Sequence, residues 1–408
     1  MRPSAYAVWL AYNAAANFAF ALVWTVVAVY YVTVVEMNPF ELVLVGTVME
    51  VAVFLFEVPT GVVADTYGRR LSIVISYLVT GVAYAAVAAT DDVGPILAAN
   101  FLLGVGLTFS SGAVEAWVTD EVGGEQLERV FLAGSRIAYV GSLLGIGGSV
   151  ALALVDLRLA IAAGALCTVL IGLGLAVFMP ERRFVPARAE DVAPWRGFAR
   201  NAASGFRAVR HSATLLVIVV ITIFFAASSE ALDRLWEAHF IRSVGFPAVL
   251  ELEPVVWFGI IDVIGLALGF VIATVVLRRL RPERPVRTVE ALLAVDSVLF
   301  VALIVFAVAG NFWIALIAYL VARRARGLRA PLFTAWLNQN TESRVRATVN
   351  SVVGQADAVG EVVGGPAIGA IGALSSLRWA LGASAVLLAP ALGLYAHALK
   401  RGGRERVA

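Results

Sequence analysis

Apolar runs of about 20 residues or more recur along the whole chain, separated by short polar breaks. A helix of that length crosses the hydrocarbon core of a bilayer, which is about 30 Å thick. Helices are expected rather than strands, because the runs are long and do not alternate strictly between polar and apolar residues. The sequence therefore predicts an all-α integral membrane protein. We expect twelve transmembrane helices, at residues 6–34, 40–64, 70–90, 94–119, 130–155, 159–179, 213–238, 254–278, 288–309, 312–338, 345–373 and 378–399.

The composition fits this class. The chain has 408 residues, of which 61% are hydrophobic and 15% are charged, whereas a soluble domain is about half apolar and about a quarter charged. The formal net charge of +2 gives no sign of nucleic-acid binding. The single Cys167 cannot form an intramolecular disulfide, and no metal motif, nucleotide loop or nucleophile–base arrangement occurs. The sequence thus predicts neither an enzyme nor a bound cofactor or metal.

Arginine is distributed unevenly between the predicted loops. With the N-terminus inside, the cytoplasmic side carries arginine at 69–70, 182–210, 278–287, 344–346 and 400–406. The opposite side has only Arg158, Arg242 and Arg378. By the positive-inside rule, both termini are predicted to be cytoplasmic, in a multi-pass protein of the inner (plasma) membrane.

One long loop divides the predicted helices into two sets of six. We expect a six-helix bundle at 1–179, a cytoplasmic linker with an amphipathic helix at 180–212, and a second six-helix bundle at 213–408. Short patterns repeat between the halves. The run 115–120 resembles the run 334–339. Arg129 with Gly147-Gly148 resembles Arg346 with Gly364-Gly365, and the two matches are separated by nearly the same number of residues. The two halves are therefore predicted to be a pseudo-symmetric duplication.

A short charged turn joins the second and third predicted helices and reads Gly61-Val-Val-Ala-Asp65-Thr-Tyr-Gly68-Arg69-Arg70. A carboxylate at a helix C-terminus opposes the helix dipole, so Asp65 is expected to pair with Arg69 or Arg70. The run resembles the loop signature of the major facilitator superfamily, G-x-x-x-D-x-x-G-R-R/K, at all five defining positions. This resemblance implies two six-helix bundles around a central cavity, transport by alternating access, and a second acidic partner at Asp120. The implied gate residues are Gly61, Asp65, Gly68, Arg69, Arg70 and Asp120.

Charged residues within the predicted helices are costly in a bilayer and so are functional candidates. Asp357 and Glu361 are four residues apart on one helical face, where two carboxylates do not both ionise readily. Candidate proton-coupling residues are Glu57, Asp262, Asp357 and Glu361. The seventh helix carries Glu230 and Asp233 on one stripe, which fits either a salt-bridge gate or a substrate contact.

The tenth predicted helix contains four arginines, at 323, 324, 326 and 329. Arg323 and Arg326 share a face, and two interpretations remain open: an anion-binding site, or internal pairing with Asp262, Asp357 and Glu361. Arg329 is expected to extend toward the inner boundary. The sequence offers no role for Asp296 in the ninth helix.

Further candidates for lining a substrate cavity lie on helices that line the cavity in this superfamily, although each also fits ordinary packing. They are Asn13, Asn17, Trp24, Trp117 and Trp336.

The runs Glu57-Val-Pro59-Thr-Gly61 and Glu115-Ala-Trp117 resemble bacterial drug-efflux branches of the superfamily. The resemblance implies a secondary active transporter that exports amphipathic organic compounds in exchange for protons. Drug antiporters carry an arginine where this chain has Asn100, so coupling must use other residues. Alternatives are transport of an organic anion or lipid-like metabolite selected by Arg323 and Arg326, and a non-transporting sensor. The expected partners are a small-molecule substrate, protons and membrane lipids, with no nucleic acid, and the protein is expected to be a monomer.

Overall fold

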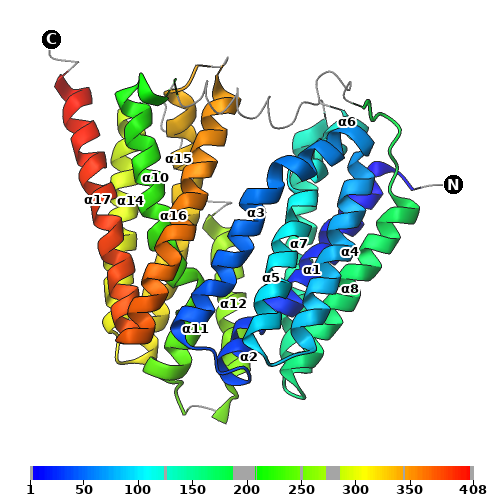
Figure 1. Ribbon diagram of the computed structural model, residues 1–408, viewed down its shortest axis with the longest axis horizontal. Coiled ribbons are helices and arrows are strands. Elements are labelled where there is room, and N and C mark those ends of the chain that lie inside the picture. Colours follow the sequence, from blue (N-terminus) through cyan, green and yellow to red (C-terminus); the bar gives the residue numbers. More distant parts are fainter. Residues whose placement is uncertain are drawn as a thin grey trace. The chain divides into compact units, whose positions relative to one another are not determined.

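The computed structural model describes residues 3–123, 126–186, 207, 209–248, 251–272, 285–342 and 345–404. Within these residues the regular structure is helical (Figure 1). The first half contains α1 (Ala5–Trp24), α2 (Val27–Thr33), α3 (Pro39–Tyr67), α4 (Arg69–Ala88), α5 (Val93–Ser110), α6 (Ala113–Val122), α7 (Leu127–Ala153) and α8 (Leu157–Phe178). The second half contains α10 (Ala213–Arg234), α11 (Trp236–His239), the π-helical turn η2 (Phe240–Val244), α12 (Pro254–Val271), α14 (Pro285–Val308), α15 (Phe312–Gln339), α16 (Arg346–Leu374) and α17 (Leu377–Arg404).

Eleven helical segments of the described chain are long and apolar enough to cross a membrane. The segment missing from this set is α15, which has 28 residues but contains four arginines. The protein is therefore helical with many apolar spans, as predicted, while the number twelve stays a prediction. The predicted amphipathic helix of the linker lies almost entirely outside the described residues, as does the end of the predicted span 254–278.

Within the part of the chain that the structure describes, three of the predicted spans are interrupted rather than continuous. The first breaks at Thr25 between α1 and α2, and the fourth breaks at Ser111 and Gly112 between α5 and α6. Gly112 has a left-handed backbone with a φ of 67°, which a residue with a side chain adopts at a cost. The seventh ends in α11 and the π-helical turn η2. Such interruptions leave backbone groups without their usual helical partners, and they often occur at functional positions.

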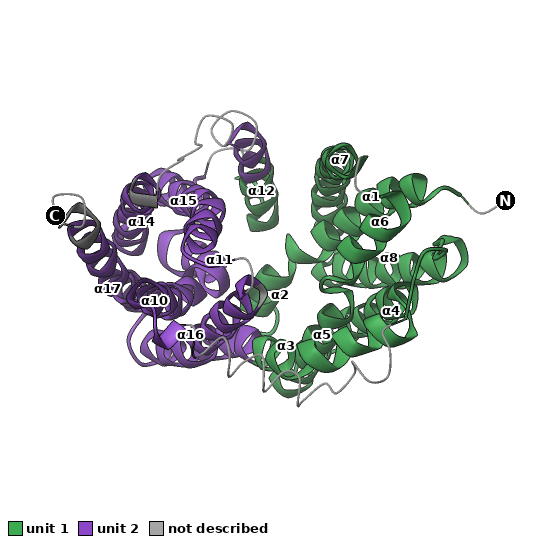
Figure 2. Cartoon of the chain, turned by 90° about the horizontal axis from the view of Figure 1, so that it is seen from above, with its two compact units in different colours: residues 1–37, 48–198, 251–263 green, residues 38–47, 199–250, 264–408 purple. Residues whose placement is uncertain are grey.

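The helices gather into two units (Figure 2). Unit 1 comprises 1–37, 48–198 and 251–263, and unit 2 comprises 38–47, 199–250 and 264–408. Each unit therefore takes a short segment from the other half of the sequence: the start of α3 belongs to unit 2 and the start of α12 to unit 1. The predicted boundaries at 179 and 213 stay predictions.

The same packing pattern occurs in both halves. In unit 1, α1 packs on α7 and α8, and α4 packs on α5 and α8. In unit 2, α10 packs on α16 and α17, and α14 packs on α15 and α17. These pairs correspond one to one when the second half is aligned with the first, which agrees with the repeat seen in the sequence.

Glycines bring the paired helices close together. A Cβ atom at Gly141 of α7 would lie 2.3 Å from the backbone oxygen of Ala14 on α1. In the corresponding helix pair of unit 2, a Cβ at Gly364 of α16 would lie 2.5 Å from the Cα of Ala227 on α10. Small residues at such contacts let helix backbones approach closely, which is how membrane helices gain packing energy without a hydrophobic effect.

We predict that Gly141→Ala destabilises the protein while Gly147→Ala on the same helix does not. An alanine at 141 must displace the α1 backbone, and overpacking of this kind costs about 1–3 kcal/mol. A Cβ at Gly147 meets nothing within 4 Å, so alanine there gains only its better helix propensity. Thermal unfolding of the two purified variants should give a lower Tm for Gly141→Ala alone. Equal Tm values would contradict the close contact.

Candidate functional site

The charges of α15 meet acidic residues from neighbouring helices of unit 2. Arg326 forms an ion pair with Asp233 near the end of α10, at a nitrogen–oxygen distance of 2.6 Å. The two side chains are 24% and 31% exposed, so the pair is only partly shielded from its surroundings. Asp233 lies in the last turn of its helix, where the dipole disfavours a negative charge, and the arginine offsets that cost.

Further carboxylates surround this pair. Glu230, one turn before Asp233, is almost fully buried, and both Glu230 and Glu361 interact electrostatically with Arg326. A Cβ at Gly365 would lie 3.3 Å from the Glu230 carboxylate, so the absence of a side chain on α16 leaves room for that group. Asp357 lies within electrostatic range of Arg326 and Arg329. The structure therefore gathers the predicted coupling residues of α16 with the predicted site residues of α10 and α15.

A second ion pair lies deeper in the unit. Arg329 donates from Nε to Asp296 on α14 at 3.1 Å, and their side chains are 7% and 0% exposed. The guanidinium also lies over the Phe225 ring at 3.4 Å from its centre. The expectation that Arg329 extends to the membrane boundary is therefore wrong, because its charge is buried among an acid and aromatic faces. The pair also explains Asp296, for which the sequence offered no role.

We call the linked charges of unit 2 the acid–arginine cluster. Arg234 and Arg323 join it because both interact electrostatically with Asp233. Its carboxyl members are Glu230, Asp233, Asp296, Asp357 and Glu361, and its guanidinium members are Arg234, Arg323, Arg326 and Arg329. The cluster thus has five carboxyls against four guanidiniums.

Arg323 and Arg234 extend the cluster in two directions. The Arg323 guanidinium lies 5.8 Å from the centre of the Tyr319 ring, and Tyr319 stacks on Trp236 at 4.3 Å. Arg234 occupies the space beside Gly46 on α3, where a Cβ would lie 2.1 Å from its Nε. A side chain at position 46 would therefore displace a member of the cluster.

The signature turn of unit 1 is a second charged site. Asp65 at the end of α3 pairs with Arg69 at the start of α4, as predicted for one of the two arginines. The Arg70 guanidinium donates instead to the backbone oxygen of Ala176 on α8. Gly68 has a φ of 124°, a backbone conformation that favours glycine. Gly61 is different, because a Cβ there would meet nothing within 4 Å.

The sequence analysis missed two glutamates here: Glu181 bonds this turn, and Glu121 bonds the backbone directly after Glu181. Glu181, just after α8, accepts a hydrogen bond of 2.9 Å from the backbone of Arg70. A carboxylate at the start of α4 is favoured by the helix dipole. Glu121 accepts from the backbone of Arg183 at 2.9 Å, and the Arg183 side chain donates to the Asp120 carbonyl at 3.5 Å. The available signal was an acidic residue near a helix end: Glu121 is in the last turn of α6, and Glu181 follows the end of α8.

The other two proton-coupling candidates bond hydroxyls at helix breaks. Ser111, between α5 and α6, donates to Glu57 at 2.8 Å. Thr25, between α1 and α2, donates to Asp262 of α12 at 2.9 Å, within unit 1. Neither acid belongs to the acid–arginine cluster, so the four proton-coupling candidates do not form one site.

The predicted cavity residues of α1 lie along one helix. Asn13 and Asn17 donate to backbone oxygens one turn earlier, at 2.8 and 2.9 Å, and both are partly buried. Trp24 donates to the Tyr84 hydroxyl at 2.9 Å and stacks on Phe20, which is 54% exposed. These side chains border an accessible face of unit 1.

The remaining two tryptophans are packing residues in the structure. Trp117 is buried and donates to the backbone oxygen of Pro180 at 2.7 Å. Trp336 is buried against Tyr395, with ring centres 5.6 Å apart. Among the described residues, no group of three or more histidine, cysteine or acidic side chains is placed to hold a metal ion.

Comparison with known proteins places this architecture in a family. The chain is 23% identical over 362 residues to the uncharacterized MFS-type transporter YxaM of Bacillus subtilis (strain 168), covering 86% of each protein. It resembles the nucleoside transporter NupG, with a TM-score of 0.77 and 12% identity over 97% of this chain and 99% of that one. It also resembles a bacterial homologue of the human lysosomal transporter Spinster, with a TM-score of 0.75 and 15% identity over 98% of each chain.

A peptide transporter of the POT family, solved with sulfate, is similar at a TM-score of 0.75 and 12% identity, over 98% of this chain and 95% of that one. The likeness to the solved structures establishes the fold. The family model of the Major Facilitator Superfamily matches residues 8–303, which is most of the chain. The protein is therefore a multi-pass membrane protein that belongs to the major facilitator superfamily of secondary transporters.

Proposed function

We propose that this protein exports an amphipathic organic molecule in exchange for protons, and that the acid–arginine cluster of unit 2 carries the proton. The observation that supports this most directly is the partly exposed Asp233–Arg326 pair with Glu230 and Glu361 beside it. Protonation of a carboxyl in the cluster weakens its hold on the arginine. A charge change of this kind can bias an element that has two arrangements.

The deeper Asp296–Arg329 pair has a different proposed role. Both of its side chains are nearly inaccessible, and aromatic rings cover the guanidinium. A proton must reach a coupling residue and leave it again during each cycle, which favours Asp233 over Asp296. We assign Asp296 to holding Arg329 in place.

The nature of the substrate rests on less direct support. Two of the similar solved proteins are named as a nucleoside transporter and a peptide transporter, which supports a small organic substrate for this chain as well. The resemblance of the 57–61 and 115–117 runs to drug-efflux branches supports an amphipathic compound and outward transport. Exposed Phe20 beside Trp24 offers an apolar surface that such a compound can contact.

The organic-anion alternative is weaker, because Arg326 and Arg329 are bonded to carboxylates. Those pairs already compensate the positive charges that would attract an anion. Arg323 lies over the Tyr319 ring, and Arg323→Ala is therefore the variant that tests this alternative.

We predict that Asp233→Asn lowers proton-driven transport at least tenfold. The asparagine cannot exchange a proton and removes the negative partner of Arg326. The measurement is ethidium uptake into proteoliposomes with an acidic interior, followed by fluorescence. Asp91→Asn is the matched control, because Asp91 pairs with Arg158 in an exposed position and should leave uptake unchanged.

Three outcomes separate the hypotheses. Ethidium movement that needs the pH gradient and Asp233 supports the proposal. Absence of any gradient-driven dye movement, with benzoate uptake that Arg323→Ala abolishes, favours the anion alternative. Ethidium binding to the purified protein without movement in vesicles favours a non-transporting sensor.

We predict that Asp296→Asn acts on stability instead. Removing one member of a buried ion pair leaves the other charge uncompensated, which typically costs about 3–5 kcal/mol. Thermal unfolding should therefore show a much larger fall in Tm for Asp296→Asn than for Asp233→Asn, whose pair is partly exposed. A similar Tm for the two variants would argue against the division of roles.

A further inference from the structure

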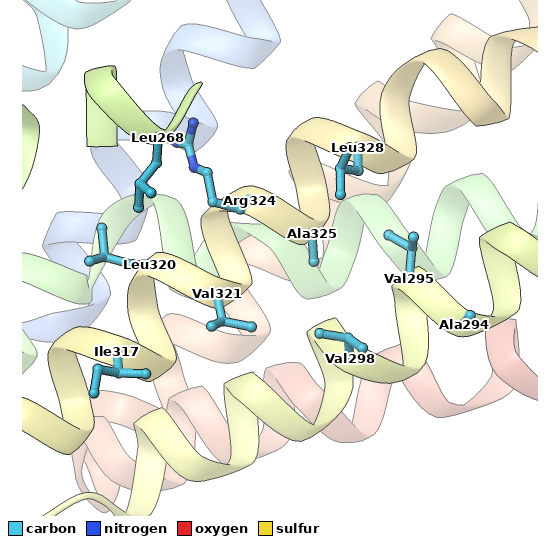
Figure 3. Close-up of a pocket in the computed structure, with 10 residues that line it drawn as sticks. All are labelled: Leu268, Ala294, Val295, Val298, Ile317, Leu320, Val321, Arg324, Ala325 and Leu328. Atoms are coloured by element: carbon cyan, nitrogen blue, oxygen red, sulfur yellow. The ribbon is translucent and has the colours of Figure 1, made fainter. Parts of the chain in front are cut away.

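Unit 2 contains a long apolar groove between α12, α14 and α15, with a volume of about 540 Å³ (Figure 3). Nine of the ten side chains that line it are leucine, isoleucine, valine or alanine. Its volume falls within the range of about 300–1,000 Å³ that is typical of small-molecule sites. The groove is distinct from the acid–arginine cluster, whose members do not line it.

The groove is open at the surface of the unit. Three of its lining residues, Val298, Ile317 and Val321, are 50%, 64% and 39% exposed. These residues lie within predicted membrane spans, where an exposed apolar surface is able to contact lipid chains. A ligand with an apolar chain can therefore enter the groove sideways from the bilayer.

One lining residue is charged. Arg324 is the thirteenth residue of α15, and a rise of ~1.5 Å per residue places it about 18 Å from the helix start, near the middle of the membrane. Its side chain extends from α15 toward Leu268 on α12 (Figure 3). A cation at that depth is costly, so its presence beside an otherwise apolar groove points to function.

Gly269 on α12 makes room for this arginine. A Cβ at position 269 would lie 2.7 Å from the Arg324 Nη1 atom. At Gly265, one turn earlier on the same helix, a Cβ would meet nothing within 4 Å. The glycine at position 269 therefore leaves the space on α12 that the Arg324 guanidinium occupies.

The chemistry selects an anion with a single apolar chain. A guanidinium binds a carboxylate through two parallel hydrogen bonds, and its five N–H donors can serve a protein group and a ligand together. The phosphate of a bilayer lipid stays near the boundary, about 15 Å from the midplane of a ~30 Å core, and does not reach Arg324. A single-chain carboxylate can lie at this depth because the charge it carries is paired there.

We propose that the groove binds a long-chain carboxylate of the fatty-acid type, with its carboxylate on Arg324 and its chain between α14 and α15. The site does not depend on proton coupling or on the substrate of the transporter. It is reached from the membrane rather than through a central cavity.

A photoreactive fatty acid with a diazirine in its chain tests this site directly. The full-length protein in lipid nanodiscs is irradiated with the probe, and the labelled peptides are mapped by mass spectrometry. Adducts should concentrate on the groove-lining residues of α14 and α15. The fatty alcohol with the same chain and diazirine is the neutral control and should label the groove at least fivefold less.

Four variants make the test specific. Arg324→Gln should reduce labelling by the acid to the level of the alcohol. Gly269→Val should displace the guanidinium and lower labelling by the acid at least threefold, whereas Gly265→Val should not. Val298→Trp should block labelling by both probes, because it fills the groove at an exposed position without touching the charge.

Equal labelling of the groove by acid and alcohol in the unchanged protein would overturn the proposal. So would acid adducts spread evenly over all membrane-facing helices. If Arg324→Gln does not fold, the pair Gly269→Val and Gly265→Val decides the matter, since both leave every charge in place.

Discussion

The arginine-rich helix α15 is possible inside a membrane only because neighbouring helices bring carboxylates and aromatic rings to it. An unpaired arginine near the bilayer centre costs about 2.5–3.5 kcal/mol by insertion measurements. Asp233 on α10 and Asp296 on α14 bond two of these arginines, and Phe225 lies under one guanidinium. In unit 2, the packing of α15 against α10 and α14 therefore also compensates the charges of its arginines. The glycines of α16 contribute to this packing, because Gly364 allows α10 to approach closely and Gly365 leaves space for Glu230.

The two halves of the protein repeat their packing but not their chemistry. Among the described residues of unit 1, the ion pairs lie at helix ends, as where Asp65 meets Arg69, and Glu181 likewise bonds the start of α4. In unit 2 they lie within the membrane spans. A duplicated framework can diverge in this way because helix contacts depend on small residues at a few positions, while the polar faces are free to change. The division fits our proposal that the second half supplies the proton-responsive charges.

Much of the fold could be predicted from the sequence, but much less of the site could be predicted. The apolar runs predicted the helices, and the signature turn indicated the family. The breaks at Thr25 and at Ser111-Gly112 were missed, because an interrupted helix and a continuous one share the same hydropathy. Asp296 had no predicted role and Arg329 was assigned to the boundary, since depth along a helix does not reveal which neighbour a side chain faces. Trp117 and Trp336 are buried and pack against neighbouring residues. The sequence alone could not distinguish this role from lining a cavity.

The sequence by itself determined the class of protein, the approximate positions of most helical segments and the kinds of charged residue within them. These properties follow from composition and local pattern, because the transfer of a segment from water into lipid depends mainly on its own residues. Only the tertiary structure decided which charges meet. Asp233 and Arg326 are 93 residues apart in the chain, and Gly269 and Arg324 lie on different helices. Such pairs depend on helix rotation and close approach, and a rotation of a single residue position would turn each side chain to another neighbour.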